Sequence, residues 1–162
     1  MKKQKKTKLT ATGLQNLKDE LVKRQGETKK KLTEDVNEAR SAGDLRENEA
    51  YSQALDNAAS NDIRILKLQS LIANSVIVNS IDDGKVGIGE RVTIQTEEGQ
   101  DKTYEIVGAT ESDPLNNKIT EDTPIGKALV GKRKGDTVKI QLPNGEVEYK
   151  ITVVEQKADS LK

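Results

Sequence analysis

The sequence predicts an α+β protein in which a long antiparallel hairpin of two helices precedes a small antiparallel β domain with a short helix. Three observations predict this class. Apolar residues recur at helical spacing in the first half, β-branched residues alternate in the second half, and apolar residues are scarce overall. Only 33% of the 162 residues are hydrophobic, 33% are charged, and Phe and Trp are absent. This composition favours an extended helical element beside a small core.

The first helix is predicted over residues 10–42, which contain no Pro. Thr10 can cap its start. The apolar positions that follow at helical spacing are Leu14, Leu17, Leu21, Leu32, Val36 and Ala39. Gln25 and Thr28 face the same way between them, so we expect the apolar seam to be thin there.

A second helix follows the Gly43-Asp44 turn and carries a heptad repeat. Its seam positions are Tyr51, Ala58, Ile65 and Ile72 at a, and Ala54, Asn61 and Leu68 at d. Two long helices joined by a tight turn pack antiparallel as a coiled-coil hairpin. About 33 residues at 1.5 Å each predict an arm of roughly 50 Å. Such an arm is a device for reach or a stalk for oligomerisation. The polar residues Gln25, Thr28 and Asn61 argue against the stalk, since extended self-association uses continuous Leu or Ile. We therefore expect a monomer.

Strand patterns begin after Asn74. The predicted strands are SVIVNSI, RVTIQT, TYEIVG, TVKIQL and VEYKITVVE. The Asn-Gly pair within Pro143–Glu146 predicts a tight hairpin between the last two, and Pro124–Gly131 predicts a short helix across the sheet. We assign residues 1–78 to the arm and 79–162 to the β domain. Residues 1–8, rich in Lys, are expected to be a disordered tail.

Composition excludes several classes of function. The net charge is zero, so this is not the composition of an autonomous DNA-binding protein. The chain has no Cys and no His, which removes disulfides, thiolate ligands and the usual general base. The basic start of the chain lacks the apolar core of a signal peptide, and no apolar run is long enough to span a membrane. We expect a cytoplasmic protein.

The stretch AGDLRENEAY, residues 42–51, admits two interpretations. Asp44 as N-cap and Glu47 as the third helical residue form a capping box, and composition alone favours this reading. The turn nevertheless holds more acids than a cap requires, and a carboxylate that caps through one oxygen keeps the other free. Capping and contact with a metal are therefore compatible.

The same stretch resembles the tip signature G-D-L-[KR]-E-N-x-x-Y of the Gre-type bacterial transcript cleavage factors. LTATGLQNLKDEL resembles the opening helix of that family, YEIVG a strand of its second domain, and TPIGKALVGKRKGDTV with PNGEVEYKI its C-terminal part. The resemblance covers about residues 9–155 in the family's order and is closest to the GreA branch. It implies that the β domain is FKBP-like.

The resemblance implies a transcription elongation factor that binds bacterial RNA polymerase and inserts its arm into the secondary channel. There it would stimulate the polymerase's own cleavage of backtracked RNA 3′ ends, with DNA contacted only indirectly. By match to the motif, Asp44 and Glu47 would act in the polymerase active site and help hold a second Mg²⁺ shared with it. We expect no stably bound cofactor in the free chain. Two metal ions in one site stabilise the attacking and leaving oxygens of a displacement.

Other residues are assigned supporting parts. The residues that would support the tip are Gly43, Leu45, Arg46, Asn48 and Tyr51. The candidates for contact with extruded RNA are Arg40, Lys29, Lys30 and Lys31. The three lysines are equally consistent with a solvated helix face balanced by neighbouring acids.

Two further alternatives concern function. Some members of this family inhibit polymerase from the same channel and carry an altered, more acidic tip; the intact D-L-R-E-N order favours cleavage. FKBP-like domains elsewhere isomerise X-Pro bonds, which needs an aromatic-walled pocket. Residues 79–162 offer only Tyr104 and Tyr149 as aromatics. We therefore expect neither isomerase nor nuclease activity from the chain itself.

Overall fold

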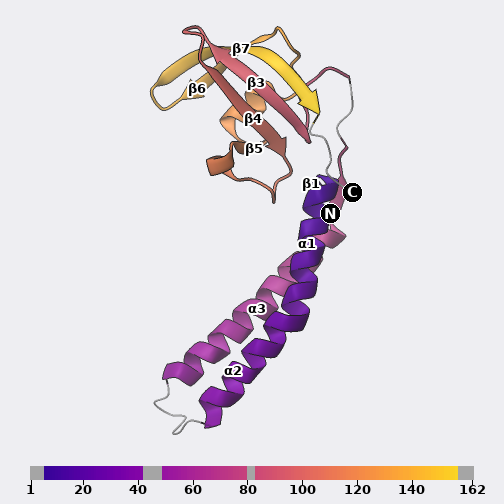
Figure 1. Ribbon diagram of the computed structural model, residues 1–162, viewed down its shortest axis with the longest axis vertical. Coiled ribbons are helices and arrows are strands. Elements are labelled where there is room, and N and C mark those ends of the chain that lie inside the picture. The colour runs from indigo at the N-terminus through magenta and orange to yellow at the C-terminus, as the bar shows by residue number, and fades with distance from the viewer. Residues whose placement is uncertain (1–5, 42–48, 80–82, 157–162) are drawn as a thin grey trace, which may run out of the picture. The chain divides into compact units, whose positions relative to one another are not determined.

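The structure is a computed structural model that describes residues 6–41, 49–79 and 83–156. The chain forms two compact units, one of residues 15–74 and one of residues 1–14 with 75–162. The first is helical and the second is built on a sheet, as the ribbon in Figure 1 shows. The predicted α+β class, a helical hairpin followed by an antiparallel sheet domain with a short helix, is confirmed.

The helical hairpin consists of a continuous first stretch of helical segments and a second helix that runs antiparallel to it. Their bounds are α1 Ala11–Lys23, the π-helical segment η1 Arg24–Thr28, α2 Lys29–Ser41 and α3 Glu49–Ala73. The predicted cap is present, because the Thr10 hydroxyl accepts a hydrogen bond from the Gly13 amide at 2.9 Å. α2 lies beside α3 (Figure 1). The hairpin is confirmed, but its first helix is interrupted by a π-helical turn that the sequence pattern did not predict.

The basic start of the chain differs from the prediction. Thr7–Leu9 form strand β1, which pairs in parallel with β2, Ser75–Ile77. Leu9 is completely buried, and its carbonyl accepts a hydrogen bond from the Val78 amide at 2.9 Å. The expectation of a disordered tail is therefore wrong for Thr7 and Lys8, because backbone pairing and burial of the next residue hold them in a strand. Residues 1–5 lie outside the described residues.

The placement of these two short strands bears on the domain boundary. Both β1 and β2 were assigned to the arm, yet they belong to the same compact unit as the large sheet. The predicted division at residues 78 and 79 stays a prediction, and residues 80–82 lie outside the described part of the chain.

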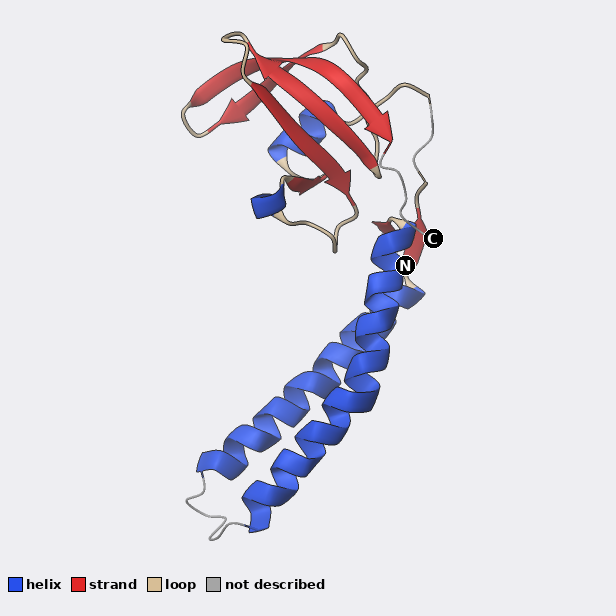
Figure 2. Cartoon of the chain, viewed as in Figure 1, coloured by secondary structure: helices blue, strands red, loops and turns tan. Residues whose placement is uncertain are grey.

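The large sheet has the order β5-β4-β3-β7-β6. Its strands are β3 Glu90–Thr96, β4 Asp101–Val107, β5 Lys118–Thr120, β6 Thr137–Leu142 and β7 Gly145–Gln156. All neighbours are antiparallel except β4 and β5, which are parallel. The pairing of β3 with β7 shifts register between Thr93 and Ile94, and a bulge of this kind increases the local twist. Figure 2 shows the resulting curvature.

Two predicted local features appear with small differences. The last two strands form a hairpin whose two turn residues are Pro143 and Asn144, while Gly145 opens β7 at a φ of 128° that favours glycine. The short helix α4 spans Pro124–Leu129, and the Thr123 hydroxyl caps it by accepting from the Gly126 amide at 3.0 Å.

The core of the sheet unit lies between the sheet and α4, which covers one face of it (Figure 2). Its most deeply buried members are aliphatic: Val86, Val92, Ile94, Ile106, Leu129, Ile140 and Ile151. Tyr149 is also buried in this core, and Tyr104 packs against it. The unit therefore builds its interior almost entirely from branched aliphatic side chains.

Candidate functional site

The predicted heptad seam of α3 is confirmed by burial. All seven assigned positions, Tyr51 to Ile72, are buried or partly buried. The four most buried residues of this helix are Ala54, Asn61, Ile65 and Leu68. The residues between the seam positions are exposed, with Arg64 and Leu71 as partly buried exceptions. The helix therefore presents one narrow stripe to its partner.

The seam on the first helix differs from the prediction at one position. Gln25 is exposed, whereas Arg24 is partly buried and makes contacts with α3. Thr28 is partly buried, as predicted, and so are Leu32 and Val36 beyond it. Residues from Thr28 to Leu32 to Val36 are spaced by four and four, where a heptad would alternate three and four. The π-helical segment absorbs this extra residue, which is what a single π-turn does in an α-helix.

Four polar side chains meet across the seam at this segment: Glu20, Arg24, Asn61 and Arg64, which we call the arm network. The Asn61 side chain is only 4% exposed. Its amide nitrogen donates to the Arg24 carbonyl at 3.2 Å, and its oxygen accepts from Arg24 Nη1 at 3.2 Å. Both ends of the buried amide therefore have a partner on the opposite helix.

Glu20 joins the two arginines of the network. It accepts from Arg24 Nε at 2.7 Å and from Arg64 at 2.9 Å (Nε) and 2.8 Å (Nη2), the latter a two-pronged pair. The two hydrogen bonds from Arg64, together with the one from Arg24, lower the pKa of Glu20 to about 2. The Glu20 carboxylate in turn raises the pKa of Arg64. Of these four residues, the heptad repeat predicted only Asn61 as part of the seam. The spacing of Glu20 and Arg24 at i and i+4, which suits an ion pair on one helix face, was a signal for two of the others.

The tip residues assigned from the sequence lie outside the described residues. This holds for Asp44 and Glu47, and also for the supporting residues Gly43, Leu45, Arg46 and Asn48. What the structure describes are the two helix ends that flank them, Ser41 of α2 and Glu49 of α3. Tyr51, in the first turn of α3, is partly buried in the seam. The assignments of these six residues, and that of Tyr51 as a support of the tip, stay predictions.

The donor set of the motif can be compared with the needs of Mg²⁺. Two carboxylates with retained waters suit this ion, which commonly takes one or two carboxylates and completes its shell from water and substrate. Elsewhere, within residues 6–41, 49–79 and 83–156, no group of three or more acidic, His or Cys side chains is placed to hold a metal. By donor chemistry, two carboxylates such as Asp44 and Glu47 would suit an ion whose other ligands come from water or another molecule.

The basic candidates lie on α2. Lys29, Lys30, Lys31 and Arg40 are all exposed. Lys29 forms an ion pair with Asp62 of α3 at 3.3 Å, with both side chains more than half exposed. Lysines in this setting can serve either of the two roles left open by the sequence, RNA contact or a solvated face.

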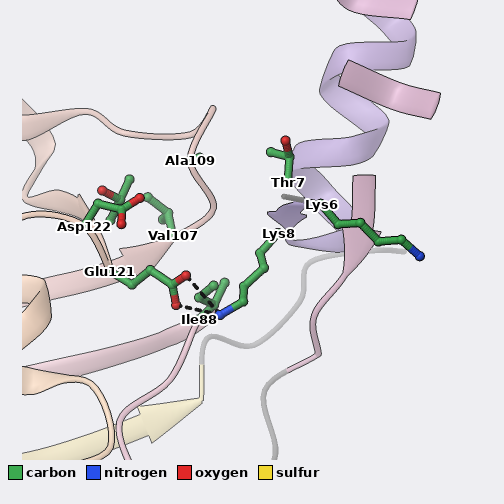
Figure 3. A pocket seen from close by; sticks show the side chains of 9 residues that line it. Lys6, Thr7, Lys8, Ile88, Val107, Ala109, Glu121 and Asp122 are labelled. Atoms are coloured by element: carbon green, nitrogen blue, oxygen red, sulfur yellow. Dashed lines mark hydrogen bonds and ion pairs between the residues drawn. The ribbon is translucent and has the colours of Figure 1, made fainter. Parts of the chain in front are cut away.

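A small cavity of about 140 Å³ lies in the sheet unit, beside β1 (Figure 3). The Lys8 side chain reaches into it and pairs with both oxygens of Glu121 at 3.0 Å. None of the nine lining residues is aromatic. The expectation that the chain is not a prolyl isomerase stays a prediction. Among the described residues, no helix is long and apolar enough to cross a membrane.

Known proteins match the chain along most of its length. A family model described as "Transcription elongation factor, N-terminal" matches residues 7–77, and one described as "Transcription elongation factor, GreA/GreB, C-term" matches residues 81–156. "Transcription elongation factor GreA" of Geobacillus kaustophilus is 38% identical over 157 residues, which are 95% of this chain and 99% of the relative. The protein of the same name from Staphylococcus carnosus is 37% identical over 158 residues, 96% of this chain and 99% of the relative.

Solved structures give a weaker match. The "Structure of the transcription factor Gfh1" is 25% identical, with a TM-score of 0.45 over 93% of this chain and 97% of that chain.

Proposed function

Because the chain belongs to the GreA/GreB family of transcription elongation factors, we propose that it acts by entering bacterial RNA polymerase with its helical arm. In this proposal the arm occupies the secondary channel and stimulates the polymerase to cleave backtracked RNA 3′ ends, which rescues arrested complexes. The observation that carries the proposal is the arm itself: α2 and α3 close their shared seam, and their ends at Ser41 and Glu49 flank the tip motif.

The arm buries its own heptad seam between its two helices, which supports reach over self-association through that seam; Val22, Leu55, Ile63 and Leu66 stay exposed outside it. Its seam residues are buried between the two helices, and most other positions of α3 are exposed. An element of this kind gains nothing from pairing with a second copy through the seam. We therefore propose that the protein works as a monomer, with the polymerase as its partner.

Asp44 and Glu47 are proposed to supply negative charge inside the polymerase active site. A second Mg²⁺ bound there would stabilise charge on the attacking and leaving oxygens of the RNA backbone. The part of this chain is to present carboxylate oxygens, which a hard cation prefers. The chain has no His and no Cys, so nucleophilic chemistry of its own is not part of the proposal.

The remaining parts of the molecule receive supporting roles. The sheet unit is proposed to dock on the polymerase while the arm reaches inward. Lys30, Lys31 and Arg40, exposed along α2, are proposed to guide extruded RNA. Exposed lysines and arginines attract phosphates without reading sequence, and such binding weakens as salt rises.

The test is an assembled elongation complex that has been backtracked by a defined step. Addition of the full chain should shorten the RNA and release a 3′ fragment, while the chain without polymerase should leave the same RNA intact. If the complex binds the chain and elongation slows with no cleavage, the protein is an inhibitor in the same channel. If the chain cleaves free RNA, the proposed division of labour is wrong.

A further inference from the structure

The apolar part of the arm's seam gives little control over how far α2 and α3 slide past each other. α3 repeats every seven residues, and two of its seam positions nearest the tip are small alanines, Ala54 and Ala58. A slide by one heptad, about 10 Å at 1.5 Å per residue, would again set apolar residues against apolar residues. Packing of the seam alone therefore discriminates poorly between registers. The paired strands β1 and β2 adjoin the start of α1 and the end of α3 and hold the helices at that end, so the part of the seam toward the tip is where alignment needs a further contact.

The arm network, in contrast, discriminates strongly between these registers. Asn61 uses its amide nitrogen and its oxygen on one residue of the opposite helix, the backbone and side chain of Arg24. Two seam positions to either side of Arg24, the first helix offers leucines: Leu17, seven residues before it, and Leu32, eight residues after it across the π-helical segment. In either slid arrangement a buried amide would face apolar side chains, and buried polar groups without partners are strongly disfavoured.

Glu20 adds a second link at the same level. Its carboxylate holds Arg24 on its own helix and grips Arg64 of α3 through both oxygens. The Glu20 carboxylate thereby holds the Arg24 side chain that contacts Asn61, and its pair with Arg64 joins the two helices. Planar pairs of guanidinium and carboxylate restrict orientation as well as distance.

The network also lies where the first helix changes phase. Arg24 is the first residue of the π-helical segment, and its carbonyl is the acceptor for Asn61. Beyond the segment, Leu32, Val36 and Ala39 return to the seam. The register set at Arg24 therefore determines which residues of α2 face α3 from there to Ser41.

We propose that the arm network is a register lock, which fixes how α2 and α3 are aligned and so where Ser41 and Glu49 hold the tip motif. Arg24 and Asn61 are positioning residues in this account, since they act through the helices that carry the motif. The consequence for RNA cleavage rests on the proposed function; the alignment of the helices does not.

The alignment is tested without polymerase. The chain has no Cys, so cysteines placed at Glu38 of α2 and Ser52 of α3, both exposed, give a unique pair of spin labels. The wild-type sequence should give one narrow distance. Asn61→Leu should keep or raise the thermal midpoint, because an apolar seam is stabilising, and should broaden or shift the distance between the labels. Asn57→Leu, the same change on the exposed face of α3, should leave the distance narrow.

The functional consequence is tested on the same variants with the backtracked complex. Asn61→Leu should bind polymerase normally and lose about 100-fold in cleavage rate, the scale of effect that a misplacement of about 1 Å can have. An unchanged narrow distance in Asn61→Leu overturns the lock, whatever the cleavage rate. A broadened distance with wild-type cleavage overturns the positioning role. If wild type itself stimulates no cleavage, the proposed function fails, and the label distances still decide the lock.

Asn61→Ala is a second variant that keeps the test valid where Asn61→Leu does not fold. Alanine matches the neighbouring seam residues Ala54 and Ala58, so the helix should form. The same broadening is expected. Loss of helical signal in both variants would overturn the lock, because Asn61 would then be required for the arm to fold and not for the selection of one register.

Discussion

The two units of the molecule obtain a unique structure in different ways. In the sheet unit, aliphatic side chains from β-strands and α4 enclose one another, and most of the fully buried residues of the described chain lie there. In the helical unit, Leu68 is the one large side chain among the described residues that reaches full burial. The sheet unit can rely on complementary packing. The arm, with a thin seam, needs polar contacts to specify its alignment.

The largest expected effect comes from truncation in the sheet core. Ile151→Ala removes a completely buried side chain and should lower the free energy of unfolding by about 2–5 kcal/mol. Leu32→Ala on the arm removes a partly buried side chain and should cost about half as much or less. Chemical denaturation followed by circular dichroism measures both. Equal costs would contradict the contrast between the units.

The next largest loss of stability is expected where two backbone segments of the sheet unit pack closely. A Cβ on Gly126 of α4 would collide with the carbonyl oxygen of Thr120. Gly126→Ala should therefore destabilise by about 1–3 kcal/mol, the usual range for overpacking. Gly87→Ala is the control, since no heavy atom lies within 4 Å of its added Cβ. A fully stable Gly126→Ala protein would show that α4 is less tightly seated than described.

The arm network predicts a dependence on pH. The hydrogen bonds from Arg64 and Arg24 lower the pKa of Glu20 from 4.5 to about 2, so the folded state favours its charged form. The stabilisation is complete above about pH 4.5 and is lost as the pH falls toward 2. Glu20→Gln should cost about 1–2 kcal/mol at pH 7, less than the full shift implies, because the partners are partly exposed and screened.

The pH profile separates this effect from general acid unfolding. Stability of Glu20→Gln, measured by denaturation between pH 7 and pH 2.5, should converge on that of wild type as the pH falls. Glu34→Gln, an exposed acid on α2, should follow wild type throughout. A constant gap between wild type and Glu20→Gln down to pH 2.5 would mean that the carboxylate charge is not what the network uses.

The smallest effect is expected at the surface of the arm. Lys29 and Asp62 form an ion pair at 3.3 Å, but both side chains are more than half exposed. Lys29→Ala should change stability by no more than about 0.5 kcal/mol. A loss comparable to that of Glu20→Gln would remove the distinction between the arm network and ordinary surface pairs.

Repeating patterns in the sequence predicted the structure where many residues agree. The seven seam positions of α3, from Tyr51 to Ile72, were found from the heptad repeat, and burial confirms them. The long strands β3, β6 and β7 were found from alternation. Two short strands were missed, β1 and β5, which have three residues each. β2 is equally short but was found, because it opens the β-branched stretch SVIVNSI.

The π-helical segment was missed for a different reason. An ideal helix projected from Leu21 through the middle of the arm puts Gln25 on the seam, and the structure puts Arg24 there instead. The two successive spacings of four residues, from Thr28 to Leu32 and from Leu32 to Val36, indicated in the sequence that the first helix holds one extra residue. Helix propensity does not show where along the helix the extra residue is accommodated. The packing against α3 shows it, here through the hydrogen bond from Asn61 to the Arg24 carbonyl.

The tip motif was assigned by resemblance to a family, and its residues lie outside the described part of the chain. A cap and a metal contact use the same residue types at the same spacing. Separating them requires a change that keeps the hydrogen bond and removes the charge.

The most direct measurement compares RNA cleavage by Asp44→Asn and Glu47→Gln with that by wild type, in the same backtracked complex. Asn caps a helix as well as Asp does, and Gln keeps the capping-box hydrogen bond, so both variants should fold and bind polymerase. Both lose the charge that Mg²⁺ requires. Each should therefore lose most of its cleavage, with partial recovery at raised Mg²⁺, while Glu49→Gln two residues further on stays near wild type. A variant at either acid that folds, binds and cleaves at the wild-type rate would contradict the account and leave the motif as a helix cap.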